Sequence, residues 1–277
     1  MKRILTIMTL SIMLPLISRA QGDDFGIWVE AAASKSIGTR WSVGLDAELR
    51  SEDNTSRIDR LSIGPSIGFK VCKYLKLGAG YNFMASYSPE KRKEHYKKDI
   101  EAPENWNGYK ITDSYWTPRH RANLDITGTV KLWKLLRISL RERYQFTYND
   151  TVTTHETKYR YDKVTDGNTG ESTYELKEDY PIEELDGKPS TNTHTLRSRI
   201  KIEIDKKHLK WSPYVSVEFH NSLQNNFHLD KLRTSIGTDY AITRQHKIGL
   251  SYILTHKFED EGTSRMHAIN ASYKFNF

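Results

Sequence analysis

Residues 41–50 read Trp-Ser-Val-Gly-Leu-Asp-Ala-Glu-Leu-Arg. Apolar side chains occupy the odd-numbered positions, and polar side chains or glycine occupy the even-numbered ones. An alternation with a period of two predicts a β-strand with one apolar and one polar face. A tilted strand of about ten residues is long enough to cross a bilayer. The stretch therefore predicts a membrane-crossing strand whose charged face is turned away from lipid.

The same alternation recurs along most of the chain, with very little helical periodicity. The further segments are 60–71, 75–83, 119–130, 136–146, 196–204, 214–219, 231–240, 247–255 and 267–277. A soluble β-sandwich would also alternate, but here arginine and glutamate lie deep within the polar faces, where a wet lumen suits them. The pattern favours an all-β transmembrane antiparallel up-and-down β-barrel of about 10 to 12 strands.

The links between these segments alternate in length. Short links fall at 72–74, 132–134, 205–210 and 242–245, long links at 87–117 and 149–193, and medium links at 221–226 and 259–264. Outer-membrane barrels keep short turns in the periplasm and long loops outside the cell. Aromatic residues gather toward both ends of the segments, as the two membrane interfaces select.

The first twenty residues have the form of a secretory signal. Lys2 and Arg3 precede an apolar stretch from Ile4 to Ile17, and Ser18-Arg19-Ala20 offers small residues for cleavage before Gln21. The apolar run is too short to span a bilayer comfortably. We expect residues 1–20 to be a cleaved signal peptide and 21–277 to form the barrel in the outer membrane.

Charge and cysteine content exclude several classes of function. Without residues 1–20 the formal net charge falls from +7 to +4, which gives no support for nucleic-acid binding. The single Cys72 makes neither an internal disulfide nor a cysteine zinc site. No phosphate loop, dinucleotide fingerprint or His-x-x-x-His spacing is present, so we expect neither a metal nor a cofactor.

Three features do not fit the simple pattern. Residues 25–34 add an eleventh strand, whereas bacterial barrels have even numbers, which favours ten or twelve strands. Parity places Glu142 on the lipid face unless a bulge turns it inward. Within the long loop 149–193, segments 158–164 and 172–177 flank Asp166-Gly167-Asn168-Thr169-Gly170, which predicts a hairpin outside the membrane.

The inward faces carry an unusual number of charged side chains. The predicted lumen-lining residues are Arg50, Arg60, Arg119, Arg121, Arg141, Arg143, Arg197, Arg199, Arg233, Glu48, Glu218 and Asp239. Inward arginines bias a pore toward small anionic solutes. The alternative is an arginine–carboxylate network that fills a narrow lumen, and parity does not decide between them.

Two other functions have weaker support. His220-Asn221-Ser222 has the spacing of a serine and its base in outer-membrane phospholipases, but the Ser-Asn-Gly continuation and an orienting asparagine are missing, so we expect no enzyme. The acidic 149–193 loop, with eleven Asp or Glu against five Lys or Arg, suits a surface-binding role. Outer-membrane lipids and lipopolysaccharide are the expected surroundings.

The order of short motifs resembles an uncharacterised outer-membrane β-barrel family of Gram-negative bacteria, a domain of unknown function. The motifs are Phe25-Gly26-Ile27-Trp28, Glu48-Leu49-Arg50, 61–65, 77–81, 140–145, 196–199, Pro213-Tyr214, and Arg233 with Gly237. The terminal Tyr273-x-Phe275-x-Phe277 is similar to the closing-strand signature that the barrel assembly machinery reads. The resemblance implies an exported barrel and carries no known activity or active-site residues.

Overall fold

The structure is a computed structural model that describes residues 23–97, 102, 105–133, 135–165, 172–206, 209–259 and 262–277. The predicted signal peptide and the predicted turn at 166–170 lie outside these residues. Within the described part of the chain, no helix is long and apolar enough to cross a membrane.

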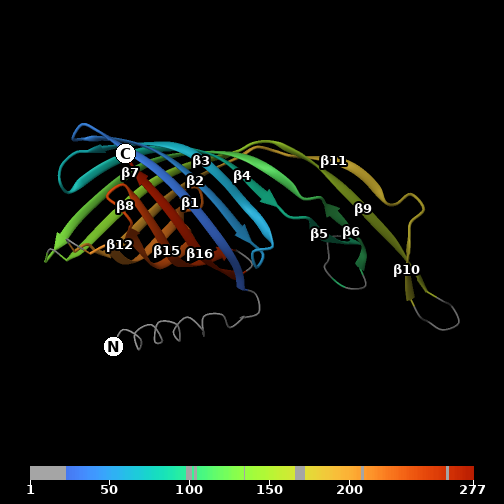
Figure 1. Cartoon of the computed structure of the whole chain (residues 1–277). Coiled ribbons are helices and arrows are strands. Elements are labelled where there is room, and N and C mark those ends of the chain that lie inside the picture. The colour runs from blue at the N-terminus through green and yellow to red at the C-terminus, as the bar shows by residue number, and fades with distance from the viewer. Residues whose placement is uncertain are drawn as a thin grey trace, which may run out of the picture.

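The described residues form sixteen β-strands. Eleven of them close into a barrel in the order β1-β16-β15-β14-β13-β12-β8-β7-β4-β3-β2 (Figure 1). The barrel strands are β1 (Asp23–Ile37), β2 (Trp41–Glu52), β3 (Arg57–Lys70), β4 (Leu75–Ser88), β7 (Tyr115–Leu132), β8 (Leu136–Asn149), β12 (Thr191–Ile204), β13 (Trp211–Ser222), β14 (Leu229–Ala241), β15 (His246–Glu259) and β16 (Gly262–Asn276).

The barrel is apolar on the outside. Leu124 and Ile236 each have 60% of their surface exposed, whereas Trp28, Met84, Ile253 and Ala268 are the buried hydrophobic residues in the described ranges. A soluble protein would lose the hydrophobic stabilisation of so many exposed apolar side chains. A lipid environment removes that cost, because the outward faces then contact acyl chains.

All ten alternating segments, and the additional one at residues 25–34, are strands of the barrel wall. Short connections join β1 to β2, β3 to β4, β7 to β8, β12 to β13 and β14 to β15, and we call this rim the short-turn end. Aromatic pairs mark this rim, including Trp41 with Phe69 at 4.7 Å and Trp211 with Tyr240 at 4.6 Å between ring centroids. The opposite rim is the long-loop end.

The even strand number expected from bacterial barrels is wrong for this chain. β1 is a full wall strand, paired antiparallel with β2 and parallel with β16 from Asp23–Arg265 to Ser34–Asn276. One parallel pair allows an odd number of otherwise antiparallel strands to close. Consequently β1 starts at the long-loop end, and eleven strands surround the lumen.

The bulge suggested for Glu142 is also absent. β8 keeps an unbroken register with β7 and β12, in which Glu142 lies between Ile126 and Ser198. Its carboxylate therefore stays on the outward face and accepts a hydrogen bond of 2.5 Å from Ser198 Oγ. In the barrel the register shifts instead at Arg50/Ser51 and at His220/Asn221.

A second sheet projects beyond the long-loop end of the barrel (Figure 1). It consists of β5 (Lys91–Tyr96), β6 (Trp106–Thr112), β9 (Val152–Thr165), β10 (Ser172–Leu176) and β11 (Ile182–Lys188). β9 pairs with β6, β10 and β11, so the sheet joins the two long links. The predicted hairpin corresponds to β9 and β10, but the three other strands were not predicted.

Candidate functional site in the barrel lumen

A cavity of about 740 Å³ lies inside the barrel and touches all eleven wall strands. It extends along β1 from Trp28 to Ser34 and along β2 from Ser42 to Arg50. The β1 range leaves out the first five residues at the long-loop end, whereas the β2 range covers almost the whole of that shorter strand. On β4 the lining residues run only from Lys76 to Asn82, which is the half of the strand nearer the short turn. The cavity therefore occupies the part of the lumen nearer the short turns.

Beyond the cavity, toward the long loops, inward-facing side chains fill the lumen. Met84 is 1% exposed, Ser86 2% and Thr255 3%. Their positions alternate in step with cavity-lining residues on the same strands, such as Asn82 and Ser251. Side chains of this size pack a narrow barrel when the strand number is small. Buried side chains therefore pack the long-loop side of the lumen in this structure.

Nine of the twelve predicted lumen residues line the cavity, namely Arg50, Arg121, Arg141, Arg143, Arg197, Arg199, Arg233, Glu48 and Glu218. The other three do not. Arg60 lies 3.8 Å from Asp59, and Arg119 faces the packed region with its Nε atom buried. Asp239 forms an ion pair of 3.2 Å with Lys274, and Lys274 rather than Asp239 lines the cavity.

Glu218 on β13 is the centre of an ion-pair cluster. Its carboxylate lies 2.6 Å from Arg141 Nη2 and 2.9 Å from Arg197 Nη2. Arg233 Nη1 is 3.9 Å away. The glutamate side chain is only 5% exposed, so these charges interact with little screening by water. The cluster links four neighbouring strands, β8, β12, β13 and β14, along one side of the lumen.

Trp28 on β1 sits beside this cluster as an aromatic platform. Its ring carries the guanidinium of Arg50 at 3.8 Å and that of Arg233 at 4.8 Å from the ring centroid. Arg50 also pairs with Glu48 at 2.6 Å. Cation–π contacts of this kind are strongest where water is excluded, and Trp28 is only 2% exposed. Together these groups form the outer boundary of the cavity.

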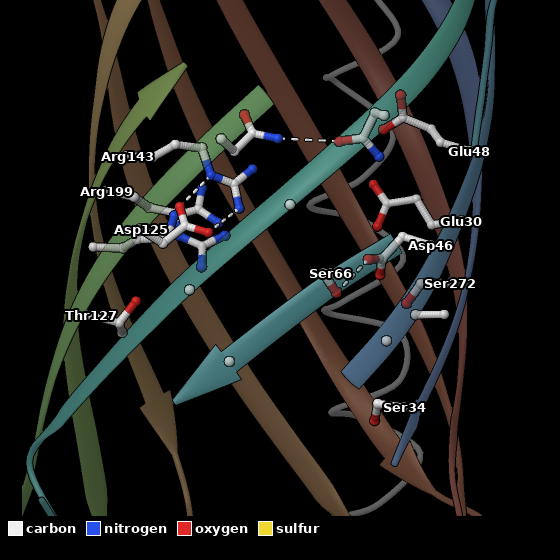
Figure 2. A pocket seen from close by; sticks show the side chains of 18 of the residues that line it. Glu30, Ser34, Asp46, Glu48, Ser66, Asp125, Thr127, Arg143, Arg199 and Ser272 are labelled. Carbon is white, nitrogen blue, oxygen red and sulfur yellow. Dashed lines mark hydrogen bonds and ion pairs between the residues drawn. The ribbon is translucent and has the colours of Figure 1, made fainter. Parts of the chain in front are cut away.

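The charged residues on the cavity wall are segregated. Figure 2 shows Glu30, Asp46 and Glu48 on one side and Asp125, Arg143 and Arg199 on the other. The first three belong to β1 and β2, whereas Arg143 and Arg199 belong to β8 and β12. Asp125 is held by Arg143, whose Nη2 atom donates to Oδ2 at 2.9 Å. The β1–β2 wall, which we call the acidic wall, therefore carries three carboxylates and one arginine, Arg50, and the facing wall is predominantly basic.

Several cavity residues were missed by the sequence interpretation. Glu30 and Trp28 belong to β1, whose role in the wall the even-number rule had put in doubt. Lys201 and Asp46 were visible as polar-face residues, but parity alone gave no reason to select them. Their importance depends on the strand order, which brings particular strands face to face.

The suggested serine–histidine pair does not form a nucleophile and base in this structure. His220 Nε2 lies 3.5 Å from Glu218 Oε2, in the interior of the barrel. Ser222 is buried, and the backbone register shifts between the two residues. Among the described residues, no group of three or more His, Cys, Asp or Glu is arranged to hold a metal ion.

The lipid-compatible outer surface, the closed wall of strands and the charged lumen define an outer-membrane-type β-barrel. The chain belongs to the family described as "Protein of unknown function (DUF2490)", whose sequence profile matches residues 25–267. No curated protein matches the chain.

Three solved structures are similar to the chain over most of its length. The β domain of the Bordetella autotransporter BrkA is 11% identical, with a TM-score of 0.47 and coverage of 87% of this chain and 86% of that one. The CymD monoaromatic hydrocarbon channel is 12% identical, with a TM-score of 0.42 and coverage of 87% and 84%. The translocator domain of the autotransporter NalP from Neisseria meningitidis is 12% identical, with a TM-score of 0.31 and coverage of 96% and 92%.

Proposed function

We propose that this protein is a narrow solute channel of the outer membrane with a preference for anions. The main support for this proposal is the charge of the cavity wall, which contains ten Lys or Arg side chains and five Asp or Glu side chains. An excess of fixed positive charge attracts anions and repels cations, because image and desolvation costs are large in a narrow pore. The same lining is too polar to favour an apolar solute.

The packed outer half of the lumen gives this channel a closed resting state. Trp28, Arg50, Arg233 and Glu218 separate the cavity from the long-loop end. Arginine side chains are long and flexible, so we expect this layer and the side chains packed beyond it, including Met84, to rearrange together without movement of the strands. We expect rare openings of small conductance rather than the steady current of a wide pore.

The proposal includes export through the signal peptide and insertion by the barrel assembly machinery. The N-terminal pattern of residues 1–20 and the terminal Tyr273-x-Phe275-x-Phe277 motif support these steps. Outer-membrane lipids and lipopolysaccharide then surround the apolar wall. Cell fractionation of the tagged full-length protein, with N-terminal sequencing of the mature form, tests this location and the predicted Gln21 start.

Single-channel recording of the refolded barrel in a planar bilayer tests the channel itself. We expect discrete openings whose reversal potential in a salt gradient indicates anion preference. Arg141→Ser combined with Arg143→Ser removes two cavity cations and should move the selectivity toward cations. The matched control is Arg160→Ser in β9 of the projecting sheet, which leaves the cavity untouched. A folded barrel that never conducts, even with the outer layer mutated, rules out the channel.

The projecting sheet supports a second candidate function, binding at the cell surface. Its aromatic face, which we define as Trp106, Tyr109, Tyr159 and Tyr161, carries stacked rings, with Tyr109 and Tyr159 4.7 Å apart and Trp106 and Tyr161 5.4 Å apart. Flat aromatic surfaces bind sugar rings as well as each other, and the lipopolysaccharide around the barrel supplies sugars. The competing explanation is that these rings hold together a sheet that has no second layer.

Binding of lipopolysaccharide oligosaccharide to the folded barrel separates these two explanations. Tyr159→Ser and Tyr161→Ser should each weaken binding if the face recognises sugar. Leu185→Ser, at an exposed position on β11 of the same sheet, is the comparison. If the oligosaccharide does not bind the wild-type protein, but the variants lose protection of β9 from proteolysis, the rings serve the sheet alone.

A further inference from the structure

The strand order places the acidic and basic walls of the cavity opposite each other. β1 and β2 are neighbours, and β12 and β8 are neighbours. Four strands separate β1 from β12 along one side of the ring, and three separate β2 from β8 along the other. A side chain on the first pair therefore points across the lumen at the second pair, as Figure 2 shows for Glu30 and Arg199.

Most charges on these walls are already neutralised by a neighbour. Glu48 pairs with Arg50, Asp125 with Arg143, and Glu218 with Arg141 and Arg197. Such groups contribute to the wall but have less capacity to hold a solute, because binding it would compete with an existing short contact.

Five charged side chains on the cavity wall are different. Within the described residues, Glu30, Lys76 and Arg199 form no ion pair and no side-chain hydrogen bond. Asp46 accepts one weak hydrogen bond from Ser66 Oγ at 3.3 Å, and Arg121 donates one to Thr147 at 3.3 Å. Of the three cations, Arg199 on β12 is the one that lies across the lumen from Glu30 in Figure 2. The electrostatic neighbours of Glu30 are Glu48, Arg50, Lys274 and Arg233. Each of those cations already contacts another partner, Glu48, Asp239 or Glu218.

The wall beside the acidic groups is built to leave space. Gly44, Gly68, Gly78 and Gly80 line the cavity on β2, β3 and β4. A Cβ atom at Gly44 would lie 2.8 Å from Ser66 Oγ, and one at Gly68 would lie 2.4 Å from the Lys76 side chain. Larger residues at these positions would push both polar side chains into the lumen, so the glycines preserve the open volume between the two walls.

From these observations we infer that the cavity accommodates small zwitterions, of which amino acids and short peptides are the natural class. The inference rests on the proposed channel function and names its solute. The carboxylate of the solute binds Arg199 and the ammonium group binds Glu30 and Asp46. A purely anionic solute satisfies only one wall, and its charge faces the carboxylates of the other. A zwitterion satisfies both, with no net charge to move through the barrel.

Four solutes with one carbon skeleton test this inference: L-alanine, L-lactate, L-alaninamide and L-lactamide. They are respectively zwitterionic, anionic, mainly cationic and neutral at pH 7, and they are nearly equal in size. The measurement is the efflux of each radiolabelled solute from liposomes containing the full mature barrel, with protein-free liposomes as the background. We expect alanine to pass roughly threefold faster than lactate, since a solvated ion pair contributes about 0.6 kcal/mol.

Variants assign the preference to the two walls. Glu30→Gln with Asp46→Asn should abolish the advantage of alanine while lactate passes at least as fast as before. Arg199→Gln should slow both solutes. Glu175→Gln in β10, an exposed carboxylate outside the barrel, is the matched control and should leave the order of the four solutes unchanged.

The outcomes separate this inference from the channel proposal. If none of the four solutes passes through a correctly folded barrel, the channel proposal fails and the inference fails with it. If lactate outruns alanine, or if the double variant keeps the preference for alanine, the channel stands and the zwitterion site is wrong. If the wild type and the Glu175→Gln control prefer alanine and the Glu30→Gln/Asp46→Asn variant does not, the zwitterion site is supported.

Discussion

Glu218 shows how a narrow lumen stabilises buried charge. One carboxylate contacts Arg141, Arg197 and His220, and Arg233 lies at the edge of the same group. Removing the negative charge lowers the free energy of unfolding by more than the intact cluster contributes to it. The reason is that the remaining buried cations are then left without a counter-charge. The glutamate is therefore the residue on which the charge balance of the cavity depends.

We expect Glu218→Gln to lower the stability of the folded barrel by about 2 kcal/mol, since three arginines then face each other without a counter-charge. Urea unfolding in lipid vesicles, followed by tryptophan fluorescence, measures the effect. Asp162→Asn is the control, because its ion pair with Lys177 is exposed and lies in the projecting sheet. Equal stability of Glu218→Gln and wild type would mean that lumen water screens the cluster.

Glu142 is the opposite case, a carboxylate on the lipid face near the middle of β8. Its outward neighbours on β8 are Leu140 and Tyr144, and Ser198 Oγ donates its hydrogen bond. Charged groups on the lipid face of a barrel are destabilising in proportion to their depth. The serine reduces that cost but does not remove it.

Glu142→Leu should therefore stabilise the barrel by about 1 kcal/mol in the same unfolding experiment. Glu142→Gln, which keeps the hydrogen bond but loses the charge, should fall between the leucine variant and wild type. Ser198→Ala should destabilise the wild-type barrel and have little effect in the Glu142→Leu background. A loss of stability in Glu142→Leu would show that the carboxylate has a stabilising partner outside this chain.

Among the elements, β9 connects the barrel to the projecting sheet, and its two faces differ in chemistry. One face carries the aromatic residues, and the other carries Glu156, which is 2% exposed. Burial by itself would raise the pKa of this glutamate, but hydrogen bonds from Lys110, Thr112 and Lys188 outweigh it and lower the pKa of Glu156 to about 2. Lys110 lies on β6 and Lys188 on β11, so the carboxylate holds three strands together.

This geometry predicts that the projecting sheet weakens in acid before the barrel does. A carboxyl with a lowered pKa contributes stability above its unfolded value near 4.5, and that contribution is lost as the pH falls toward about 2. Hydrogen exchange of β9 and β11 amides, corrected for intrinsic rates, should accelerate between pH 5 and pH 2.5, a window taken from these two pKa values. In Glu156→Gln the sheet should be less protected already at pH 5 and lose this acid dependence. Unchanged protection in the wild type would contradict the stated role of Glu156.

The elements also show what alternation can and cannot predict. In an outer-membrane barrel, each wall strand faces lipid on one side and the lumen on the other. Apolar and polar residues therefore alternate in segments such as 41–50. The projecting sheet is not part of the barrel wall and encloses no lumen. Lys91–Tyr96 and Ile182–Lys188 therefore lack that contrast and were interpreted as loops. Only β9 and β10 carried a recognisable hairpin signal, because the sequence between them contains Asp166-Gly167-Asn168-Thr169-Gly170.

At the scale of the whole molecule, the strand order determines what the cavity does. The inward direction of Arg143 and Arg199 follows from the alternation of side chains along each strand. Their position opposite Glu30 and Asp46 follows instead from the closure of eleven strands into a barrel. That closure depends on which edge strand meets β1, and no local pattern in residues 25–34 encodes a partner more than two hundred residues away. The residues of the site were thus partly predictable from the sequence, and their arrangement was not.

The parallel pairing of β1 with β16 is therefore the feature of the fold to test first. Val29 and Ala271 are register partners that both face outward. Neighbouring strands lie about 5 Å apart, a separation that a disulfide spans without distortion. In a Cys72→Ser background, which removes the one natural thiol, Val29→Cys with Ala271→Cys should form an intramolecular disulfide in the folded barrel, seen as a mobility shift reversed by reductant.

The offset pair Val29→Cys with Phe275→Cys is the matched control. Phe275 lies four positions further along β16, where its register partner is Ala33, so this pair should remain reduced under the same mild oxidation. If the offset pair joins as readily as the register pair, the edge strands slide past each other and the closure is not fixed. If neither pair joins in a barrel that is otherwise folded, β1 does not close the wall, the acidic side of the cavity loses Glu30, and the opposition of the two charged walls fails with it.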